Sequence, residues 1–232
     1  MTFVDRLLAD PPLIHGDDRA ATITHGLQPD VLRFLETQAQ AGLRTVETGS
    51  GLSTIVLAQG GAEHICVVPS RAETERIRAY CERLGIATDR LVFHTAPSEH
   101  VLPKLELGAL DLVLIDGSHS FPQPFVDWLY TATALRIGGL VIVDDTHIWT
   151  GRVLRDFLRA EPEWELVEDW LGRTAAFRKT AEGDPDRVWI DQPFVARRSQ
   201  TGRTAALRLA ATLIRRGELG DLAARARRSL GR

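Results

Sequence analysis

Three aspartates and a histidine stand at the ends of two apolar segments, where their side chains could bind a cation and move a proton. Asp116 follows the run LDLVLI, and the run GLVIV ends in Asp144 and Asp145. Ionisable groups at the exit from a core indicate a site as well as a turn, because a turn needs only Gly, Asn or Ser. His119 titrates near neutral pH and stands three residues after Asp116, so it is a candidate general base.

The carboxylates would meet at one edge if the two segments are neighbouring parallel strands, and like charges at that distance repel. A bound cation stabilises such a group, and oxygen ligands with room for water favour Mg²⁺, or else Mn²⁺ or Ca²⁺, over zinc. The alternatives are that the acids cap the following helices and that His119 is an ordinary loop histidine. The Asp144–Asp145 pair weakens the first alternative, because one cap needs only one acid.

An alternation of strand-like and helix-like segments must position these side chains. Strands rich in Val, Ile and Leu are expected at 43–48, 64–68, 90–95, 110–115 and 139–144, and helices at 28–41, 53–59, 71–84, 97–106, 122–136 and 150–160. This alternation predicts an α/β, doubly wound, Rossmann-like sheet with helices on both faces, since right-handed crossovers place the helices there. The runs WELVEDW and RTAAFRK, separated by Leu171 and Gly172, predict a hairpin at its end.

The first strand ends in ETGSGLST, residues 47–54, which is typical of a ligand-binding turn. Gly49 and Gly51 remove side chains where a backbone must approach a ligand, Ser53 or Thr54 can cap the next helix, and Glu47 could meet a cationic ligand. A tight turn without a ligand remains the alternative. A nicotinamide dinucleotide is disfavoured, because Thr54 occupies the third-glycine position and no acid ends the second strand.

Composition limits the class of protein. The chain has 232 residues, 44% of them hydrophobic and 25% charged, which predicts one globular domain with an appendage. The net charge of −3 argues against a general nucleic-acid binder, and two cysteines without a CxxC pair fit a reducing compartment. We expect a cytoplasmic protein with neither a signal peptide nor a membrane span. The expected divisions are an N-terminal segment that could cover a pocket (1–27), the main domain (28–180), and a linker with a basic helical tail (181–232).

The motifs ETGSGLST, LDLVLIDGSHS and GGLVIVDDTHIW, in this order and spacing, resemble those of class I S-adenosylmethionine-dependent methyltransferases. The likeness is greater to metal-dependent O-methyltransferases, including catechol-type, macrolide-sugar and cephalosporin-hydroxylase-like groups, and covers about residues 30–180. It implies a seven-stranded sheet with an antiparallel last strand. It also implies S-adenosylmethionine as cofactor, Mg²⁺ or another divalent cation, and a small hydroxylated substrate such as a sugar or an aromatic compound.

The resemblance also implies roles for individual residues. The segment 47–53 would approach the methionine and ribose of the cofactor, residues near Ala96 and Ser98 would border the adenine, and His119 would be the base. The candidate cofactor-binding residues are Glu47, Gly49, Ser50, Gly51, Ser53, Ser70, Ala96, Ser98 and Asp116. The candidate metal ligands are Asp116, Asp144 and Asp145.

One departure from the family concerns the acid that usually closes the second strand and binds both ribose hydroxyls. This chain has VVPSRAE there, so that Ser70 or Glu73 substitutes or the affinity for the cofactor is weak. The departure keeps a non-catalytic binding or scaffold protein open as an alternative function, beside a hydroxylase-like member of the same fold. Intact acids at the strand ends argue against the non-catalytic alternative.

The C-terminal tail combines leucines and alanines with many arginines. The segment LRLAATLI predicts a helix with one apolar face, which we expect to pack on its own domain or on a second copy of the chain. Attachment to a membrane surface is a less favoured alternative, and nucleic-acid binding is less favoured still.

Overall fold

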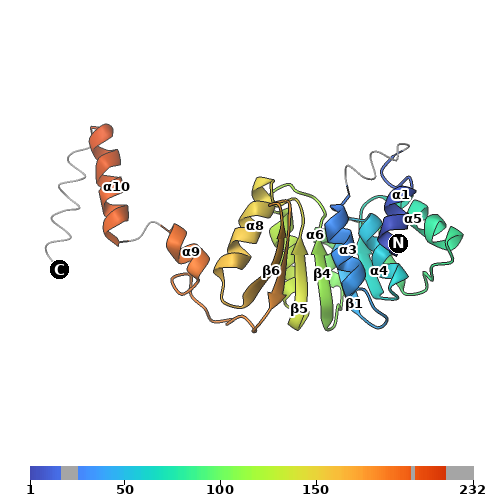
Figure 1. The fold of residues 1–232 in the computed structure, drawn as a ribbon. Helices are drawn as coiled ribbons and strands as arrows, with labels where there is room; N and C mark the ends of the chain where they lie inside the picture. The colour runs from blue at the N-terminus through green and yellow to red at the C-terminus, as the bar shows by residue number, and fades with distance from the viewer. Residues whose placement is uncertain (17–25, 200–201, 218–232) are drawn as a thin grey trace. The chain divides into compact units, whose positions relative to one another are not determined.

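A computed structural model of the chain describes residues 1–16, 26–199 and 202–217. The chain divides into two units, Met1–Pro185 and Asp186–Arg232, and the first contains a seven-stranded sheet of order β3-β2-β1-β4-β5-β7-β6 (Figure 1). The strands are β1 (Arg44–Thr48), β2 (Glu63–Val67), β3 (Leu91–His94), β4 (Leu110–Ile115), β5 (Leu135–Val143), β6 (Trp164–Trp170) and β7 (Thr174–Lys179). The predicted fold class is confirmed.

The strand order reverses between β1 and β4, which places a crevice at the carboxyl ends of these strands. β1 pairs in parallel with both β2 and β4, and β4 pairs in parallel with β5. Beyond the strands, the amide of Asp116 donates to the Thr48 carbonyl and the amide of Asp144 donates to the Ile115 carbonyl. The acidic ends of β4 and β5 therefore lie side by side, as the sequence predicts.

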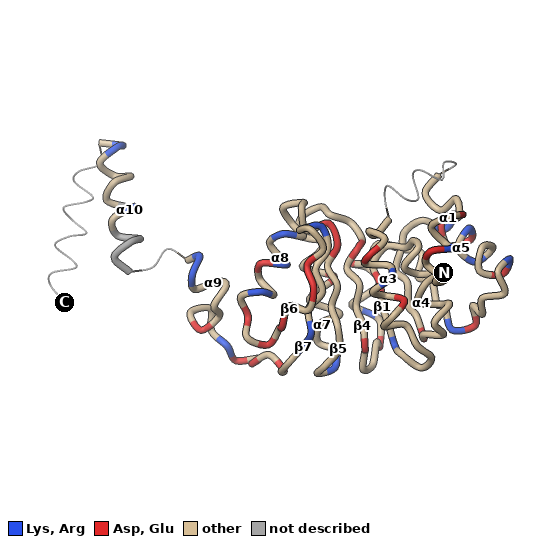
Figure 2. Tube along the Cα trace, in the orientation of Figure 1, with Lys and Arg blue, Asp and Glu red and all other residues tan. Residues whose placement is uncertain are grey.

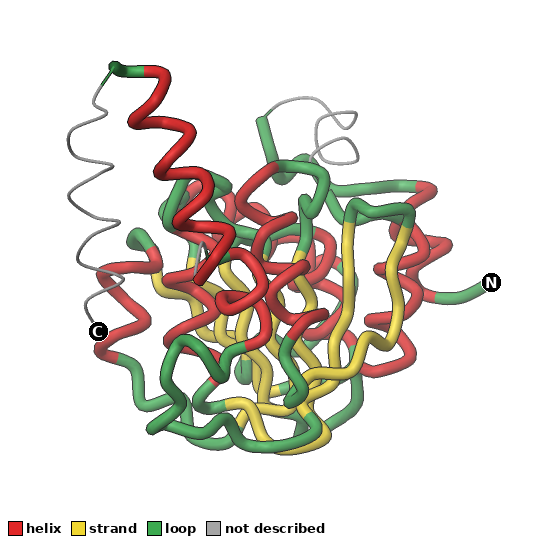
Figure 3. Tube along the Cα trace, turned by 90° about the vertical axis from the view of Figure 1, so that its left-hand side faces the viewer, coloured by secondary structure: helices red, strands yellow, loops and turns green. Residues whose placement is uncertain are grey.

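Helices cover both faces of the sheet because alternate strand residues point to opposite sides (Figure 3). Leu112 and Leu114 belong to a buried cluster with α1 (Phe3–Ala9), α3 (Pro29–Gln38), α4 (Leu52–Gln59) and α5 (Arg71–Arg83). Val113 and Ile115 face the other cluster, against α7 (Gln123–Ala132) and α8 (Trp149–Ala160). The connection between β3 and β4 contains α6 (Ser98–Val101) and the 3-10 turn η1 (Leu102–Lys104). Two-sided burial explains why these strands are continuously apolar.

The structure differs from the sequence-based prediction at the start of β5. The expected helix at 122–136 ends at Ala132, and β5 begins at Leu135, four residues before the expected strand. Leu135 pairs with Leu110, and pairing resumes at Leu140 opposite Leu112, so that the intervening residues form a bulge. The sequence signal was misleading because Gly138 and Gly139 stand inside the strand, where glycine normally marks its edge.

The hairpin at the end of the sheet is confirmed. β7 runs antiparallel to both β5 and β6 and lies between them. The turn at 171–173 is fixed to the end of β5 by Thr146, whose amide donates to the Arg173 carbonyl and whose Oγ1 donates to the Gly172 carbonyl, both at 2.8 Å. Because β7 is antiparallel, this turn lies at the same edge as the carboxyl ends of the parallel strands.

Charge on the first unit is mixed, with both signs interspersed along α5 and α8 (Figure 2). The second unit contains α9 (Pro193–Arg198) and α10 (Gly202–Arg215), and in α10 Leu213 is buried while Leu207 and Ile214 are exposed. The tail arginines Arg225, Arg227 and Arg228 lie outside the described residues, and the tail's role as an oligomer contact stays a prediction. No helix in the described part of the chain is long and apolar enough to cross a membrane.

Candidate functional site

A pocket of about 720 Å³ opens at the carboxyl edge of the sheet, where the strand order reverses. This volume lies within the range of small-molecule and cofactor sites. Its wall comes from the carboxyl ends of the parallel strands and the segments that follow them, from the turn before β7, and from the N-terminal segment. The residues at or after the strand ends are 48–50, 67–69, Glu73, 97–99, 116–119, Gln123, Asp144, Asp145, His147 and Ile148; the turn supplies Arg173, and the N-terminal segment supplies His15 and Gly26. The pocket is therefore where open α/β sheets bind their ligands.

The glycine loop meets the end of β4 as well as the pocket. Gly49 and Ser50 line the cavity, whereas Gly51 lies outside its wall. Gly49 has φ +96°, and an added Cβ would lie 2.2 Å from the Asp116 carbonyl oxygen. The absence of a side chain at Gly49 is therefore required by the chain itself, whether or not a ligand also approaches the backbone there.

Glu47 is buried beneath this loop, outside the pocket wall, so its predicted meeting with a cationic ligand has no support in its placement. Its carboxylate is 1% exposed and accepts hydrogen bonds from Ser53 Oγ, at 2.7 Å, and from Thr54 Oγ1. His64 Nε2 lies 3.1 Å from Glu47 Oε1, within ion-pair distance, although the angle is too poor for a hydrogen bond. Glu47 and Ser53 therefore join the start of α4 to β1 and β2.

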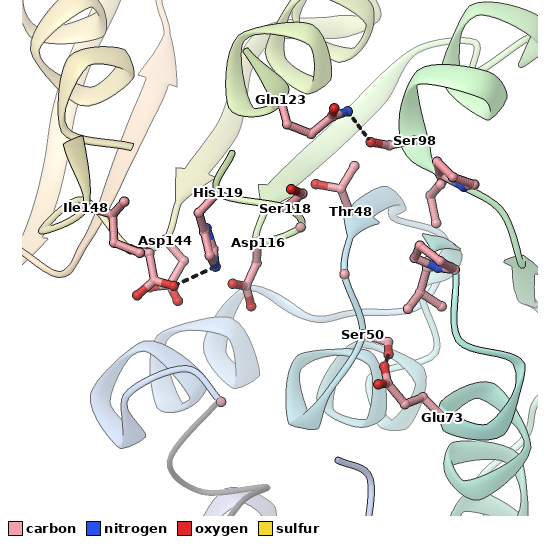
Figure 4. Close-up of a pocket in the computed structure, with 18 of the residues that line it drawn as sticks. Thr48, Ser50, Glu73, Ser98, Asp116, Ser118, His119, Gln123, Asp144 and Ile148 are labelled. Atoms are coloured by element: carbon pink, nitrogen blue, oxygen red, sulfur yellow. Dashed lines mark hydrogen bonds and ion pairs between the residues drawn. The ribbon is translucent and has the colours of Figure 1, made fainter. Parts of the chain in front are cut away.

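The two candidates for the missing ribose acid differ in placement. Ser70 caps α5, accepting from the Glu73 amide at 3.3 Å, and does not line the pocket. Glu73 does line it, and it accepts from Ser50 Oγ at 2.9 Å with His15 Nδ1 at 3.5 Å (Figure 4). Burial raises the pKa of Glu73, but the hydrogen bonds from His15 and Ser50 outweigh it and the pKa is lowered. Glu73 is therefore a carboxylate acceptor that the cavity offers.

The N-terminal segment reaches the same end of the cavity. Arg76 on α5 donates to the carbonyls of Ile14 and Gly16, at 3.0 and 3.2 Å, and holds this segment in place. His15 consequently lies in the pocket wall, and the predicted covering role of segment 1–27 stays a prediction. His25, the other histidine of this region, lies outside the described residues.

The segment after β3 supplies polar groups from a buried network. Ser98 Oγ donates to Asp127 Oδ1 at 2.6 Å and accepts from Gln123 Nε2 at 2.8 Å, and both Ser98 and Gln123 line the pocket (Figure 4). Burial raises the pKa of Asp127. Ala96, which was expected to border the adenine, is not in the wall, and Gln123 was missed because the sequence placed it only inside a helix.

The three strand-end aspartates occupy different environments. Burial raises the pKa of Asp116 well above its ordinary value, and the carboxylates of Asp144, Glu47 and Asp145 raise it further. Burial also raises the pKa of Asp144, against a hydrogen bond from Thr174 that lowers it. The proximity of these carboxylates means that negative charge on one disfavours negative charge on the others.

His119 lies within reach of the other aspartate, Asp145. Its Nε2 is 2.8 Å from Asp145 Oδ2, and His147 Nδ1 is 3.4 Å from Oδ1 (Figure 4 draws the first contact). The contact between His119 and Asp145 raises the pKa of His119 and lowers the pKa of Asp145. In both residues burial acts in the opposite direction and is the smaller effect. Asp145 itself has a positive φ of 51°, which is uncommon for a residue other than glycine and indicates a functional constraint.

A divalent cation fits the residues at this end of the pocket. Asp116, His119 and Asp145 each offer a ligand atom, and these atoms all lie within 4.8 Å of one another. Two carboxylates and an imidazole suit a divalent metal, and carboxylates that raise one another's pKa mark a place where a cation is stabilising. Asp144, the third predicted ligand, lies beside this group and is held by Thr174, so the structure brings together two of the three acids with the predicted base.

Comparisons with known proteins agree with this geometry. Residues 46–146 match a family described as a methyltransferase domain. The chain is 35% identical over 120 residues to a catechol O-methyltransferase of Mycobacterium tuberculosis (strain H37Rv), and the match covers 49% of this chain and 52% of that protein, so the chain spans about half of this relative's length.

Solved structures share the fold. An O-methyltransferase from Bacillus cereus in complex with SAH has a TM-score of 0.55 at 21% identity, over 77% of this chain and 98% of that one. The O-methyltransferase TomG from Streptomyces achromogenes, in complex with SAM, has a TM-score of 0.55 at 17% identity, over 78% and 100%. Both identities are low, so these two likenesses bear on the fold alone.

Proposed function

We propose that this chain is a class I S-adenosylmethionine-dependent methyltransferase that methylates a hydroxyl group of a small molecule, a sugar or an aromatic compound, with the help of a divalent cation. The match of residues 46–146 to a methyltransferase domain supports this proposal. The observation that carries the proposal is one cavity with two chemically different ends. Ser50, Glu73 and Ser98 lie at the cofactor end, and Asp116, His119 and Asp145 form the acceptor end.

At the cofactor end, the wall offers groups that match a nucleoside. Glu73 can accept hydrogen bonds from the ribose hydroxyls, which would compensate for the missing acid at the end of β2. Ser98 and Gln123, ordered by the buried Asp127, lie after β3 and at the start of α7, on the side expected to hold the adenine. Gly49 brings the loop backbone to the same cavity without a side chain.

At the acceptor end, Asp116 and Asp145 would hold the cation, with Asp144 beside them. A divalent cation in such a site lowers the pKa of a hydroxyl bound next to it and orients that hydroxyl. Asp145 orients the imidazole of His119 by accepting from Nε2–H at 2.8 Å, and the other ring nitrogen, Nδ1, would accept the hydroxyl proton. The oxygen forms its bond to the methyl carbon while the carbon–sulfur bond breaks, and the electron pair of that bond stays on sulfur.

The decisive first experiment is a calorimetric titration of the chain with S-adenosylmethionine, with and without Mg²⁺. Binding in the micromolar range supports the proposal and justifies a screen of hydroxylated acceptors. In that screen the mass of the product distinguishes the two reactions: methyl transfer adds one methyl group, and hydroxylation adds one oxygen. A folded chain that binds no S-adenosylmethionine in either condition contradicts the proposal and leaves the non-catalytic alternative.

His119→Ala then tests the base. We expect the variant to keep its affinity for S-adenosylmethionine and to lose about 10²–10⁴-fold in turnover, the usual contribution of a general base. His100→Ala is the matched control, because His100 is exposed on α6 and does not line the pocket. Turnover by His119→Ala equal to that of the control would remove His119 from the mechanism.

A further inference from the structure

The acceptor end of the pocket contains a cation that the proposed chemistry does not use. Of the residues known to form the wall, Arg173 is the one lysine or arginine, beside five acids: Glu73, Glu99, Asp116, Asp144 and Asp145. Arg173 comes from the turn before β7, so it lies at the edge of the sheet on the side of β5, next to Asp145, His147 and Ile148 rather than at the cofactor end. Its position indicates a role toward the acceptor.

The backbone at Arg173 is held firmly. Thr146, which is fully buried, donates hydrogen bonds to both Arg173 and Gly172, and the Gly172 amide donates to Asp169 Oδ1 at 2.9 Å. The turn is therefore tied to β5 on one side and to β6 on the other. A side chain that starts from such a fixed backbone keeps its place at the pocket without an ordering cost to the loop.

The guanidinium of Arg173 has no hydrogen bond or ion pair within the described residues. Neighbouring arginines differ in this respect, since Arg155 pairs with Asp156 at 2.9 Å and Arg159 pairs with Asp169 at 3.3 Å. The charge of Arg173 contributes to the lowered pKa of Asp145, but only after the hydrogen bond from His119 and the charges of both histidines. Arg173 is therefore near enough to Asp145 for their charges to interact, while its N–H groups have no acceptor among the described residues.

We propose that Arg173 binds a negatively charged group on the acceptor, so that the preferred substrate is a hydroxylated carboxylic acid. The inference rests on the proposed function, because it takes the cation site at Asp116 and Asp145 as the place of the reacting hydroxyl. A guanidinium presents two parallel N–H donors, which match the two oxygens of a carboxylate. The arginine also offsets the surplus of negative charge that would otherwise repel an anionic substrate from this wall.

The test measures the binding of three probes that differ only in charge: 3,4-dihydroxybenzoate, 3,4-dihydroxybenzamide and 3,4-dihydroxybenzylamine. These probes carry the vicinal hydroxyls and the aromatic ring of one substrate class named in the proposed function. Titrations are run with Mg²⁺, in the presence and absence of S-adenosylhomocysteine, so that binding is observed without turnover. We expect the wild-type chain to bind the benzoate about 10–100-fold more tightly than the benzamide, as a charge-assisted hydrogen bond provides.

Variants assign this preference to one residue. Arg173→Gln should remove the advantage of the benzoate and leave the affinity for the benzamide within about twofold, and Arg173→Glu should reverse the order in favour of the benzylamine. Arg152→Gln is the matched control, since Arg152 is exposed on α8 and does not line the pocket. Melting temperatures show whether each variant is folded.

Three results would overturn the inference: equal binding of benzoate and benzamide by the wild-type chain, an equal loss of both in Arg173→Gln, or no binding of any probe. The equal loss would mean that Arg173 supports Asp145 and not the substrate. Failure of the proposed function is a different outcome, in which the benzoate still binds through Arg173 but S-adenosylmethionine does not bind and no methylated product forms.

Discussion

Replacement of Gly49 by alanine tests whether the glycine loop is fixed by the end of β4. Gly49 has φ +96°, and an added Cβ would lie 2.2 Å from the carbonyl oxygen and 2.9 Å from the carbonyl carbon of Asp116. A left-handed conformation costs a residue other than glycine about 1–2 kcal/mol, and a methyl group forced into a packed site costs about 1–3 kcal/mol. We therefore expect Gly49→Ala to lower the free energy of unfolding by about 2–5 kcal/mol.

Differential scanning calorimetry measures this loss. One kcal/mol corresponds to about 2–4 °C in a chain of this size, so the melting temperature should fall by about 4–20 °C. Gly51→Ala is the control in the same loop, because its Cβ would meet only His15 Nε2 at 3.8 Å, an ordinary contact, and the backbone there is extended. We expect the control to shift by less than about 3 °C.

The reasoning is refuted if Gly49→Ala melts within about 2 °C of the wild-type chain, or if the two variants lose the same amount. In either case the Asp116 carbonyl would not be fixed against the loop. A further consequence concerns the site, because a displaced Asp116 carbonyl shifts its carboxyl group as well. Gly49→Ala should therefore also weaken Mn²⁺ binding, measured by calorimetry below the melting transition, whereas Gly51→Ala should not.

Three other changes test the assignment of the acids. Asp116→Asn should stabilise the chain at pH 7 in the absence of metal and abolish Mg²⁺ or Mn²⁺ binding. A carboxyl whose pKa is raised in the folded state makes the protein less stable as the pH rises above the pKa of the unfolded state. The stability gained by Asp116→Asn should therefore disappear below about pH 4, and thermal melts from pH 3 to 8 measure it. Glu73→Gln should weaken S-adenosylmethionine binding about 10–100-fold in calorimetry, whereas Ser70→Ala should cost about 1 kcal/mol of stability and leave the affinity unchanged. Asp145→Asn should lower the pKa of His119 in a metal-free NMR titration, because the contact that raises it is lost, and an unchanged pKa would contradict the 2.8 Å pairing.

The sequence predicts the sheet well because burial on both faces makes β4 and the second half of β5 mostly apolar, and the helices between the strands follow from topology. It also predicts that Asp116 and Asp144 adjoin, since consecutive strands of this fold are neighbours. The sequence could not show that Asp145 rather than Asp144 faces His119. That arrangement depends on the positive φ at Asp145 and on the hydrogen bond from Thr174 to Asp144, two residues that are thirty positions apart in the chain. Arg173 was missed although the hairpin and an antiparallel last strand were predicted, because no motif marks the turn before β7 as part of a pocket wall.

The contrast between Glu47 and Asp116 shows what distinguishes a structural acid from a functional one at this edge. Glu47 lies fully buried near the end of β1, whereas Asp116 follows β4 and lines the pocket, and the groups around the two carboxylates differ. Glu47 receives hydrogen bonds from Ser53 and Thr54 and an ion-pair contact from His64, so its charge is compensated by the chain. Asp116 faces Asp144 and Asp145 instead, and its raised pKa is the consequence. Glu47→Gln should therefore destabilise the chain, the opposite sign to Asp116→Asn, and equal signs in a melting experiment would mean that the surroundings of these two acids do not separate their roles.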